Sequence, residues 1–360
     1  MEIISGGISK CLHRSMLNKN IIKRILWQIA VTWKSSTSNL LPHAASMGRG
    51  NQTVVAEFIL AGFSNFPDLQ IPLFLVFSLI YLVTLMANII IITAIRLDRS
   101  LHIPMYFFLS ILSFSEICYS LVIIPNMLAN LLREKKTISF IGCATQMCIF
   151  LGFGCTNCML LAVMGYDRYV SICKPLRYQI LMNQSLCTKL VACSATTGFL
   201  FSTSETIIIF TLPFCGPNKL KHFFCDLAPL LELACGRNYI GETVIFIICV
   251  LVVICAFLFI LLSYFLIVNT VLKIPTTAGK RKAFSTCASH LIVVVVHFGC
   301  ASIIYLRPKS RYTLDEDTFI SVSYTMVTPL LNPLVYSLRN KDVQIALKKS
   351  LGKSSCTQRM

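Results

Sequence analysis

The sequence predicts an all-α membrane protein in which seven apolar helices cross the bilayer. Of its 360 residues, 56% are hydrophobic and 13% are charged, whereas a soluble domain has about a quarter charged residues. The apolar residues gather into seven runs, each long enough to span a hydrocarbon core about 30 Å thick. The runs lack the alternation of apolar and polar residues that is typical of β-strands. Helices, which satisfy every backbone group internally, are therefore favoured over a barrel.

The amino-terminal part of the chain differs from the rest. Residues 1–46 are basic, and their apolar stretch Ile25–Val31 is shorter than the roughly 20 residues that a span requires. We expect 1–46 to be a disordered extension. A signal peptide cleaved near Ala44–Ser46 is the alternative. Residues 47–70 should form an extracellular amino terminus, where Asn51 begins an Asn-Gln-Thr glycosylation acceptor.

The seven-helix domain is expected over residues 71–338, followed by a cytoplasmic tail at 339–360. In the tail, Ser337–Lys349 alternates apolar and basic residues at helical spacing, which predicts a short amphipathic helix on the inner leaflet. The predicted spans are Ile71–Ile95, Pro104–Leu132, Cys143–Tyr166, Leu190–Leu212, Thr243–Val271, Ala283–Leu306 and Phe319–Leu338.

The distribution of Lys and Arg sets the predicted orientation. The loops on the side of the carboxyl terminus, together with the tail, contain more Lys and Arg than the loops on the other side. This excess marks the tail side as cytoplasmic. The net charge of +17 is therefore attributed to membrane topology rather than to nucleic-acid binding. The basic amino-terminal extension argues the other way.

Four of the seventeen cysteines lie on the predicted outer face: Cys143, Cys215, Cys225 and Cys235. An oxidising compartment favours disulfides between them. Four cysteines allow three connectivities, and spacing does not choose among them. Most other cysteines lie in apolar runs, where they behave as small hydrophobic residues. Cys225 and Asp226 have no second ligand pair at zinc-like spacing, so no metal site is expected.

Several polar side chains lie inside the apolar runs, where they are costly and usually face the bundle interior. They are Asn88, Glu116, Asn157, Glu205, His290, His297 and Asn332. For the amides, hydrogen bonding between helices is a simpler explanation than ligand contact. In the seventh run, Pro333 removes a backbone donor and permits a kink. A kinked helix that carries Tyr336 can repack as a unit, as a switch requires.

The third run ends in a charged pair, Asp167 and Arg168. Charges cost little at the membrane boundary, so the pair could act as a stop signal that anchors the helix. Alternatively, the acid could hold the base in one state and release it to a partner in another.

The string Met164–Tyr178 resembles the aspartate–arginine–tyrosine signature of rhodopsin-like G-protein-coupled receptors, in the longer form found in odorant receptors. Three more strings, Leu101–Ser110, Lys282–His290 and Pro329–Asn340, are similar to odorant-receptor motifs and follow in the same order. The resemblance covers Met47 to about Lys349. It implies a receptor that binds a small volatile, mostly apolar ligand and activates a stimulatory olfactory-type G protein, which raises cAMP.

The resemblance further implies a multi-pass plasma-membrane protein of sensory cilia. Its partners would be an odorant, a heterotrimeric G protein and membrane lipids. No nucleic acid, cofactor or enzymatic activity is expected. A transporter would show internal repeats and broken helices, and a membrane enzyme would need a metal cluster or a nucleophile–base set. The sequence displays neither pattern.

The resemblance also assigns roles to residues. It implies the disulfides Cys143–Cys225 and Cys215–Cys235. Ligand binding would fall to Met147, Phe150, Leu151, Gly154, Cys155, Ile248, Val252, Phe298, Ala301, Ser302, Tyr305, Val322 and Thr325. This set contains no fixed acid to pair with an amine, so a neutral or weakly polar ligand is expected.

Two more groups follow from the resemblance. Activation and G-protein coupling would depend on Asp167, Arg168, Tyr169, Tyr264, Asn332, Pro333 and Tyr336, with Asp167 holding Arg168 at rest. An intramembrane polar network would contain Asn88, Glu116 and Asn157. Asn157 stands where the family favours an acid, which departs from the family's sodium-linked pattern.

Overall fold

The structure is a computed structural model. It describes residues 55–63, 66–214, 217–235, 239–305, 318, 320–339 and 343–346. The chain separates into two units, Met1–Val54 and Val55–Met360, and all described residues belong to the second. The predicted extension 1–46, the acceptor Asn51 and the loop residue Cys215 lie outside the described residues. Of the predicted amphipathic tail helix beyond Arg339, residues 343–346 are described and are helical.

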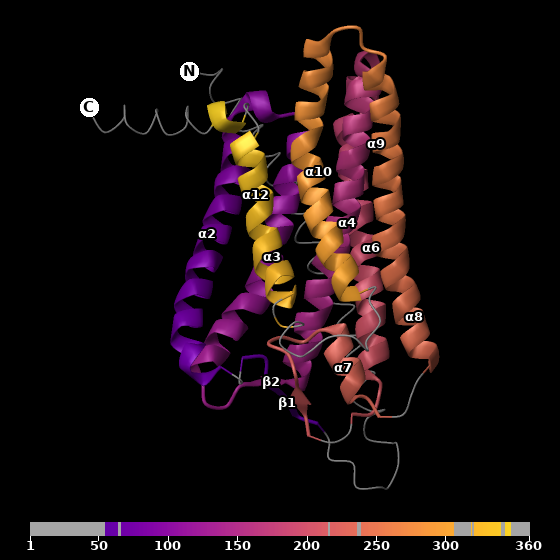
Figure 1. Ribbon diagram of the computed structural model, residues 1–360. Coiled ribbons are helices and arrows are strands. Elements are labelled where there is room, and N and C mark those ends of the chain that lie inside the picture. The colour runs from indigo at the N-terminus through magenta and orange to yellow at the C-terminus, as the bar shows by residue number, and fades with distance from the viewer. Residues whose placement is uncertain are drawn as a thin grey trace, which may run out of the picture. The chain divides into compact units, whose positions relative to one another are not determined.

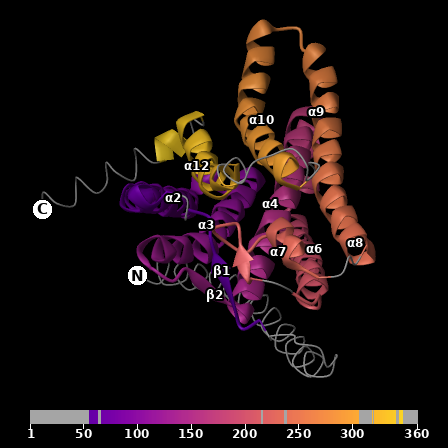
Figure 2. The same ribbon diagram turned by 60° about the horizontal axis from the view of Figure 1, so that its bottom comes forward.

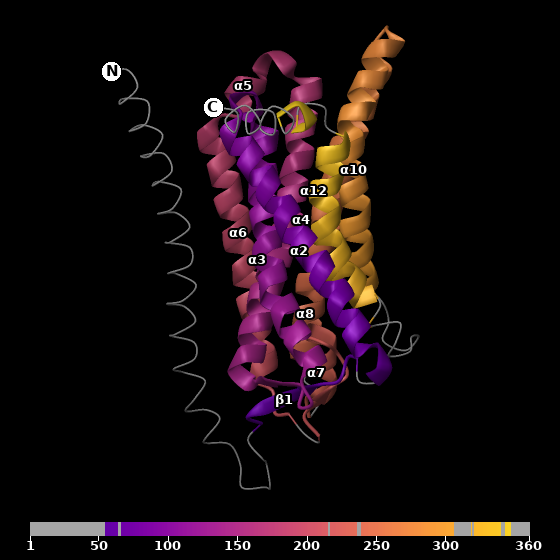
Figure 3. The ribbon, with the colours of Figure 1, turned by 90° about the vertical axis from the view of Figure 1, so that its left-hand side faces the viewer.

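Long helices run side by side through the second unit (Figures 1 and 3). Five of the predicted spans correspond to α2 (Gln70–Leu97), α3 (Pro104–Leu132), α4 (Phe140–Cys173), α6 (Gln184–Phe210) and α10 (Thr277–Tyr305). The fifth span is divided into α8 (Tyr239–Val250), the π-helical turn η4 (Leu251–Cys255) and α9 (Ala256–Leu272). The described part of the seventh includes the π-helical turn η5 (Ser323–Val327) and α12 (Thr328–Arg339). The predicted all-α, seven-helix architecture is confirmed.

Short elements connect the long helices. They are η1 (Pro67–Leu69), η2 (Arg99–Leu101), η3 (Pro175–Arg177), α5 (Tyr178–Leu181) and α7 (Leu227–Leu233). Helix α4 continues seven residues past the predicted end of its span at Tyr166, to Cys173. The reason is that hydropathy marks where the chain leaves the lipid, whereas the helix ends where its backbone hydrogen bonds end.

Among the described helices, five are long and apolar enough to cross a membrane: η1–α2, α3, α4, α8–α9 and α10. Within their most apolar stretches, 67% of α4 is buried, compared with 22% of α2 and 22% of α8–α9. Helix α4 is therefore the central helix of the bundle. The outer helices expose large apolar side chains such as Leu79 and Met86 of α2 and Phe265 of α9, which is the surface that a lipid environment requires.

The closest approach between α4 and α6 depends on glycine. A Cβ on Gly198 of α6 would lie 2.9 Å from both the carbonyl oxygen of Gly152 and the backbone nitrogen of Thr156 in α4. Small residues let membrane helices approach to backbone contact. Glu205 follows Gly198 by about two helical turns, so it lies on the same buried face of α6.

We predict that Gly198→Ala destabilises the receptor by about 1–3 kcal/mol, because the added methyl group meets backbone atoms that cannot move aside. Gly299→Ala is the matched control, since a Cβ there meets no atom within 4 Å. Both substitutions gain the same helix propensity. Thermal unfolding in detergent should show a lower transition temperature for Gly198→Ala only. Equal transition temperatures for the two variants would disprove the close contact.

A small three-stranded sheet lies at one end of the bundle, next to α7 (Figure 2). Strand β1 (Glu57–Leu60) pairs antiparallel with β2 (Thr137–Ser139) and parallel with β3 (Lys219–Leu220). The sequence did not predict this sheet, because such short strands carry no periodicity and form by pairing segments far apart in the chain. Phe58 of β1 is fully buried and packs against Phe140, which anchors the sheet to the start of α4.

A disulfide joins Cys143 of α4 to Cys225, as the resemblance implied. One turn along α4, the Gln146 side chain accepts the Cys225 backbone N–H at 3.0 Å and donates to the Val122 carbonyl of α3 at 2.9 Å. The loop is thereby fixed to two helices at this end of the bundle, called the disulfide end below. Cys235 is also disulfide-bonded.

We predict that Cys143→Ser and Cys225→Ser each reduce delivery to the cell surface, because losing a native disulfide commonly costs about 2–5 kcal/mol. Cys193→Ser is the control, since Cys193 is a free, exposed cysteine on α6. Flow cytometry of an epitope-tagged receptor measures the effect. Normal surface levels of the Cys143 and Cys225 variants would show that the bridge is not required.

Candidate functional site

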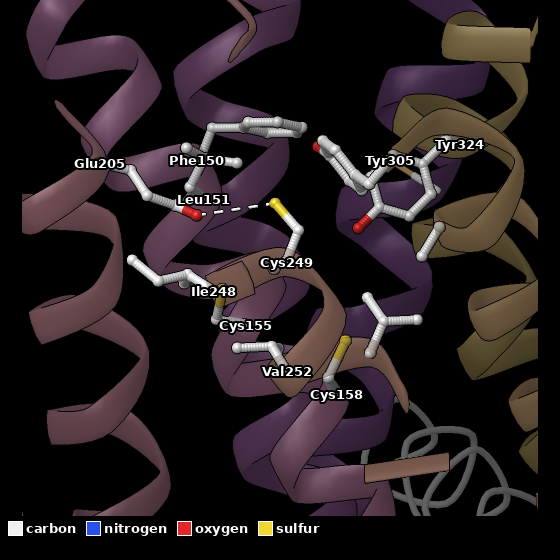
Figure 4. A pocket seen from close by; sticks show the side chains of 13 residues that line it. Phe150, Leu151, Cys155, Cys158, Glu205, Ile248, Cys249, Val252, Tyr305 and Tyr324 are labelled. Atoms are coloured by element: carbon white, nitrogen blue, oxygen red, sulfur yellow. Dashed lines mark hydrogen bonds between the residues drawn. The ribbon is translucent and has the colours of Figure 1, made fainter. Parts of the chain in front are cut away.

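A cavity lies inside the bundle, between α4, α6, the α8–η4 segment, α10 and η5 (Figure 4). The space between the protein atoms there amounts to about 440 Å³, part of which is open to the surroundings. Its walls are mostly apolar, with one carboxyl group and two phenols. The lining residues are Phe150, Leu151, Gly154, Cys155, Cys158, Glu205, Ile248, Cys249, Val252, Val253, Ala301, Tyr305 and Tyr324.

The structure brings together eight of the predicted ligand residues around this cavity. They are Phe150, Leu151, Gly154, Cys155, Ile248, Val252, Ala301 and Tyr305. Five others, Met147, Phe298, Ser302, Val322 and Thr325, do not line it. Phe298 packs against the Phe257 ring, and the Thr325 hydroxyl donates to the Ser321 carbonyl at 2.7 Å. In this structure their contacts are those of helix packing.

The sequence analysis missed five lining residues: Cys158, Glu205, Cys249, Val253 and Tyr324. Two π-helical turns explain part of this difference. A π turn adds one residue and changes which side chains face inward, and η5 brings Tyr324 to the cavity. In the seventh helix, the resemblance had assigned the lining to Val322 and Thr325. Glu205 was missed because the fourth span was not considered as a wall of the pocket, although an acid inside an apolar run was a visible signal.

Glu205 corrects the expectation of a pocket without a fixed acid. Its side chain is 1% exposed, and it accepts a hydrogen bond from the Cys249 thiol at 3.6 Å (Figure 4). On the opposite wall, Tyr305 and Tyr324 lie together, with ring centroids 6.4 Å apart. The cavity thus combines a hydrocarbon-like wall with an acid on one side and two phenols on the other.

Asp226 connects the disulfide loop to the cavity. Its carboxylate accepts the Leu227 backbone N–H at 2.8 Å, at the start of α7, and a hydrogen bond from the Tyr305 hydroxyl. Burial raises the pKa of the Asp226 carboxyl to about 6, against the opposing effect of these two donors. A side chain of the cavity wall is therefore held in place by the loop next to Cys225.

A polar network crosses the bundle farther from the disulfide end. One carboxylate oxygen of Glu116 accepts the Asn157 amide at 3.1 Å and the Asn332 amide at 2.8 Å. The Asn157 side-chain oxygen accepts from the Ser115 hydroxyl at 2.5 Å. Helices α3, α4 and α12 meet at these buried groups. Asn157, which stands where the family favours an acid, here serves as an amide donor to Glu116.

Asn88 joins α2 to α12 at a carbonyl that lacks its helical donor because of Pro333. Pro333 has no N–H, so the Pro329 carbonyl four residues earlier lacks its helical donor. The Asn88 amide donates to that carbonyl at 3.1 Å and to the Thr84 carbonyl of its own helix at 3.0 Å. A hydrogen bond between α2 and α12 thus replaces one that the helix itself cannot make.

At the other end of α4, Asp167 and Arg168 interact electrostatically. Asp167 is buried and accepts the Tyr178 hydroxyl at 2.9 Å. Within the described part of the chain no ion pair joins it to Arg168, and the second oxygen of Asp167 and Nε of Arg168 have no hydrogen-bond partner. Consecutive residues of a helix point in directions about 100° apart, so their side chains do not face each other.

Arg168 also interacts electrostatically with Tyr264, His290 and Tyr336. The His290 ring bridges two helices: its Nε2 lies 3.1 Å from the Leu161 carbonyl of α4 and its Nδ1 lies 2.9 Å from the Tyr264 hydroxyl of α9. A carbonyl can only accept, so Nε2 carries the proton and Nδ1 accepts from Tyr264.

Tyr169, which follows Asp167 and Arg168, contacts a different set of residues. Its ring lies 6.2 Å from that of Tyr166, centroid to centroid, and the Lys174 ammonium lies 5.6 Å from its centroid. The described residues contain no group of three His, Cys, Asp or Glu side chains placed to hold a metal ion.

Comparisons with known proteins agree with this arrangement. A family model described as olfactory receptor matches residues 77–354. Human olfactory receptor 10T2 is 56% identical over 311 residues, which cover 86% of this chain and 99% of that protein. Human olfactory receptor 10R2 is 57% identical over 303 residues, which cover 84% of this chain and 90% of that protein. Human olfactory receptor 10K2 is 56% identical over 303 residues, which cover 84% of this chain and 97% of that protein.

The family model extends over most of the chain and includes Cys143, Cys225 and the charged end of α4. The family consists of receptors and not of enzymes, and membership implies a multi-pass protein of the plasma membrane that detects odorants through G-protein signalling. The chain belongs to the olfactory receptor family.

Proposed function

We propose that this receptor binds a small volatile odorant in the cavity between α4, α6, η4 and α10, and activates a stimulatory olfactory-type G protein that raises cAMP. The observation that carries the proposal is the largely apolar set of side chains from α4, α6, η4 and α10 that converges on this cavity. Such a cavity suits a ligand of few atoms that loses its water on entry. The thirteen lining residues are the proposed contacts, including the five that the sequence did not assign.

In the proposed orientation, the disulfide end faces the outside, with an extracellular amino terminus in sensory cilia, and the Arg168 end faces the cytosol. Disulfides persist in an oxidising compartment, which supports an outward position for Cys143 and Cys225. The excess of Lys and Arg in the loops and tail of the opposite side supports the same orientation. The exposed apolar faces of α2 and α9 would contact membrane lipids.

The proposed signal passes from the cavity to Arg168 through groups that join the helices. Tyr324 lines the cavity and lies in the turn that precedes α12, and Asn332, Pro333 and Tyr336 follow on α12. A ligand shifts the balance between two packings of the bundle only if it binds one of them more tightly than the other. The hydrogen bonds of Asn332 and His290 are placed to differ between such packings, because each links two or more helices.

We predict that Arg168→Ala abolishes the odorant-stimulated rise in cAMP without lowering surface expression. The guanidinium has no hydrogen-bond acceptor at Nε among the described residues, so it is available to a partner protein and its loss leaves few internal bonds broken. Arg99→Ala is the control, because Arg99 is an exposed cation at the same end of the bundle. An odorant panel with a cAMP reporter supplies the measurement.

A full response of Arg168→Ala at matched surface levels would contradict the proposed coupling role and leave Asp167 and Arg168 as a membrane anchor. A receptor silent to the whole panel, despite normal delivery to the surface, would contradict the proposed function itself.

We further predict that residues 1–46 are dispensable. The alignment with human olfactory receptor 10T2 covers 99% of that protein but 86% of this chain, so part of this chain has no counterpart there. A receptor that starts at Met47 should respond to the same odorants as the full chain, at equal surface expression measured through an added amino-terminal epitope. A lost response despite normal surface levels would show that the extension takes part in function.

A further inference from the structure

We propose that Glu205 makes this receptor selective for volatile amines, by forming an ion pair with the ammonium group of the ligand inside the cavity. The inference deepens the proposed function and rests on it, because it assumes that the cavity is the odorant site. It commits that site to a chemical class of ligand that the apolar lining alone would not suggest.

The position of Glu205 is the first argument. The residue lies on α6, is 1% exposed and lines the cavity with the apolar side chains of Leu151 and Ile248. Its carboxyl group points to the thiol of Cys249 across the cavity wall (Figure 4). That thiol, at 3.6 Å, is a weak donor. Within the described residues, no Lys, Arg or His side chain forms a hydrogen bond or ion pair with Glu205.

The second argument is the charge around the cavity. Asp226 is close enough to Glu205 to interact with it electrostatically, so two acids face the same region. Asp226 is already satisfied by the Leu227 N–H and the Tyr305 hydroxyl, which leaves Glu205 as the acid with acceptor capacity to spare. His297 does not line the cavity, because it lies behind Cys158, with Nε2 3.3 Å from that sulfur. Two acids favour a cationic guest over an anionic one.

The third argument is the cost of an unpaired acid. A carboxylate in an apolar cavity is strongly disfavoured unless an opposite charge pairs with it. An alkyl ammonium supplies that charge and buries its hydrocarbon part against Leu151, Ile248 and Val252. If amine and acid meet in their neutral forms, one proton moves from the carboxyl group to the nitrogen and the same pair results.

The first test compares ligands that share a cyclohexyl ring on the unmodified receptor. Cyclohexylamine and cyclohexanol differ in one group, and N-cyclohexylacetamide keeps the nitrogen but removes its basicity. Because hydrogen bonds to a charged group are stronger than neutral ones, the amine should raise cAMP at a concentration about tenfold or more below that of the alcohol. The amide should behave like the alcohol. An alcohol or amide as potent as the amine would overturn the proposal.

The second test removes the charge of the acid. Glu205→Gln keeps the size of the side chain, and it should raise the half-maximal concentration of cyclohexylamine by about tenfold or more. The value for cyclohexanol should change by less than about threefold, because a neutral guest loses no ion pair. The matched control is Glu242→Gln, on α8, which does not line the cavity and should leave the response to the amine unchanged.

The measurements distinguish a failure of the proposed role of Glu205 from a failure of the proposed receptor function. An unchanged ratio of amine to alcohol potency in Glu205→Gln would overturn the role of Glu205 but leave the receptor function intact. A response to alcohols without any response to amines would do the same. Silence of the unmodified, surface-delivered receptor toward all three compounds and the wider odorant panel would contradict the proposed function and this inference together.

Discussion

The architecture of this receptor depends on one constraint, that polar groups inside a membrane must find partners within the bundle. The hydrogen bond from Asn88 to the Pro329 carbonyl is the clearest case. Pro333 deprives that carbonyl of its helical donor, and no water from the lipid side can replace it. Glu116 meets the same constraint by accepting two amides. These bonds tie α2, α3 and α4 to α12 and fix the register in which the helices pack.

At the disulfide end, buried polar groups of a loop also find partners within the bundle. Gln146 satisfies the Cys225 backbone and the Val122 carbonyl together, so the bridge to Cys143 is supported by hydrogen bonds on both sides. Asp226, the next residue, holds Tyr305 of the cavity wall. The loop that closes the bundle and the wall that meets a ligand are therefore one hydrogen-bonded assembly, which explains how a loop distant in sequence can influence the shape of the cavity.

At the opposite end of the bundle, Arg168 interacts electrostatically with its neighbours but forms no ion pair among the described residues. Asp167 accepts a hydrogen bond from Tyr178 and interacts electrostatically with Arg168. Arg168 also interacts electrostatically with Tyr264, His290 and Tyr336. His290 joins α4 and α9 through a proton whose place is fixed by the Leu161 carbonyl.

The sequence by itself determined the membrane class, the seven helical runs and most of their bounds, because hydropathy reports directly on the solvent around each segment. Through its motifs it also indicated the family, the Cys143–Cys225 bridge and eight residues of the cavity. Only the tertiary structure decided the sheet of β1, β2 and β3, the inward position of Tyr324 and the place of Glu205 in the cavity wall. The sheet depends on pairing of segments far apart in the chain, Tyr324 lies in the π-helical turn η5, and Glu205 lies on the helix that approaches α4 at Gly198. Periodicity within one helix contains no information about its neighbours.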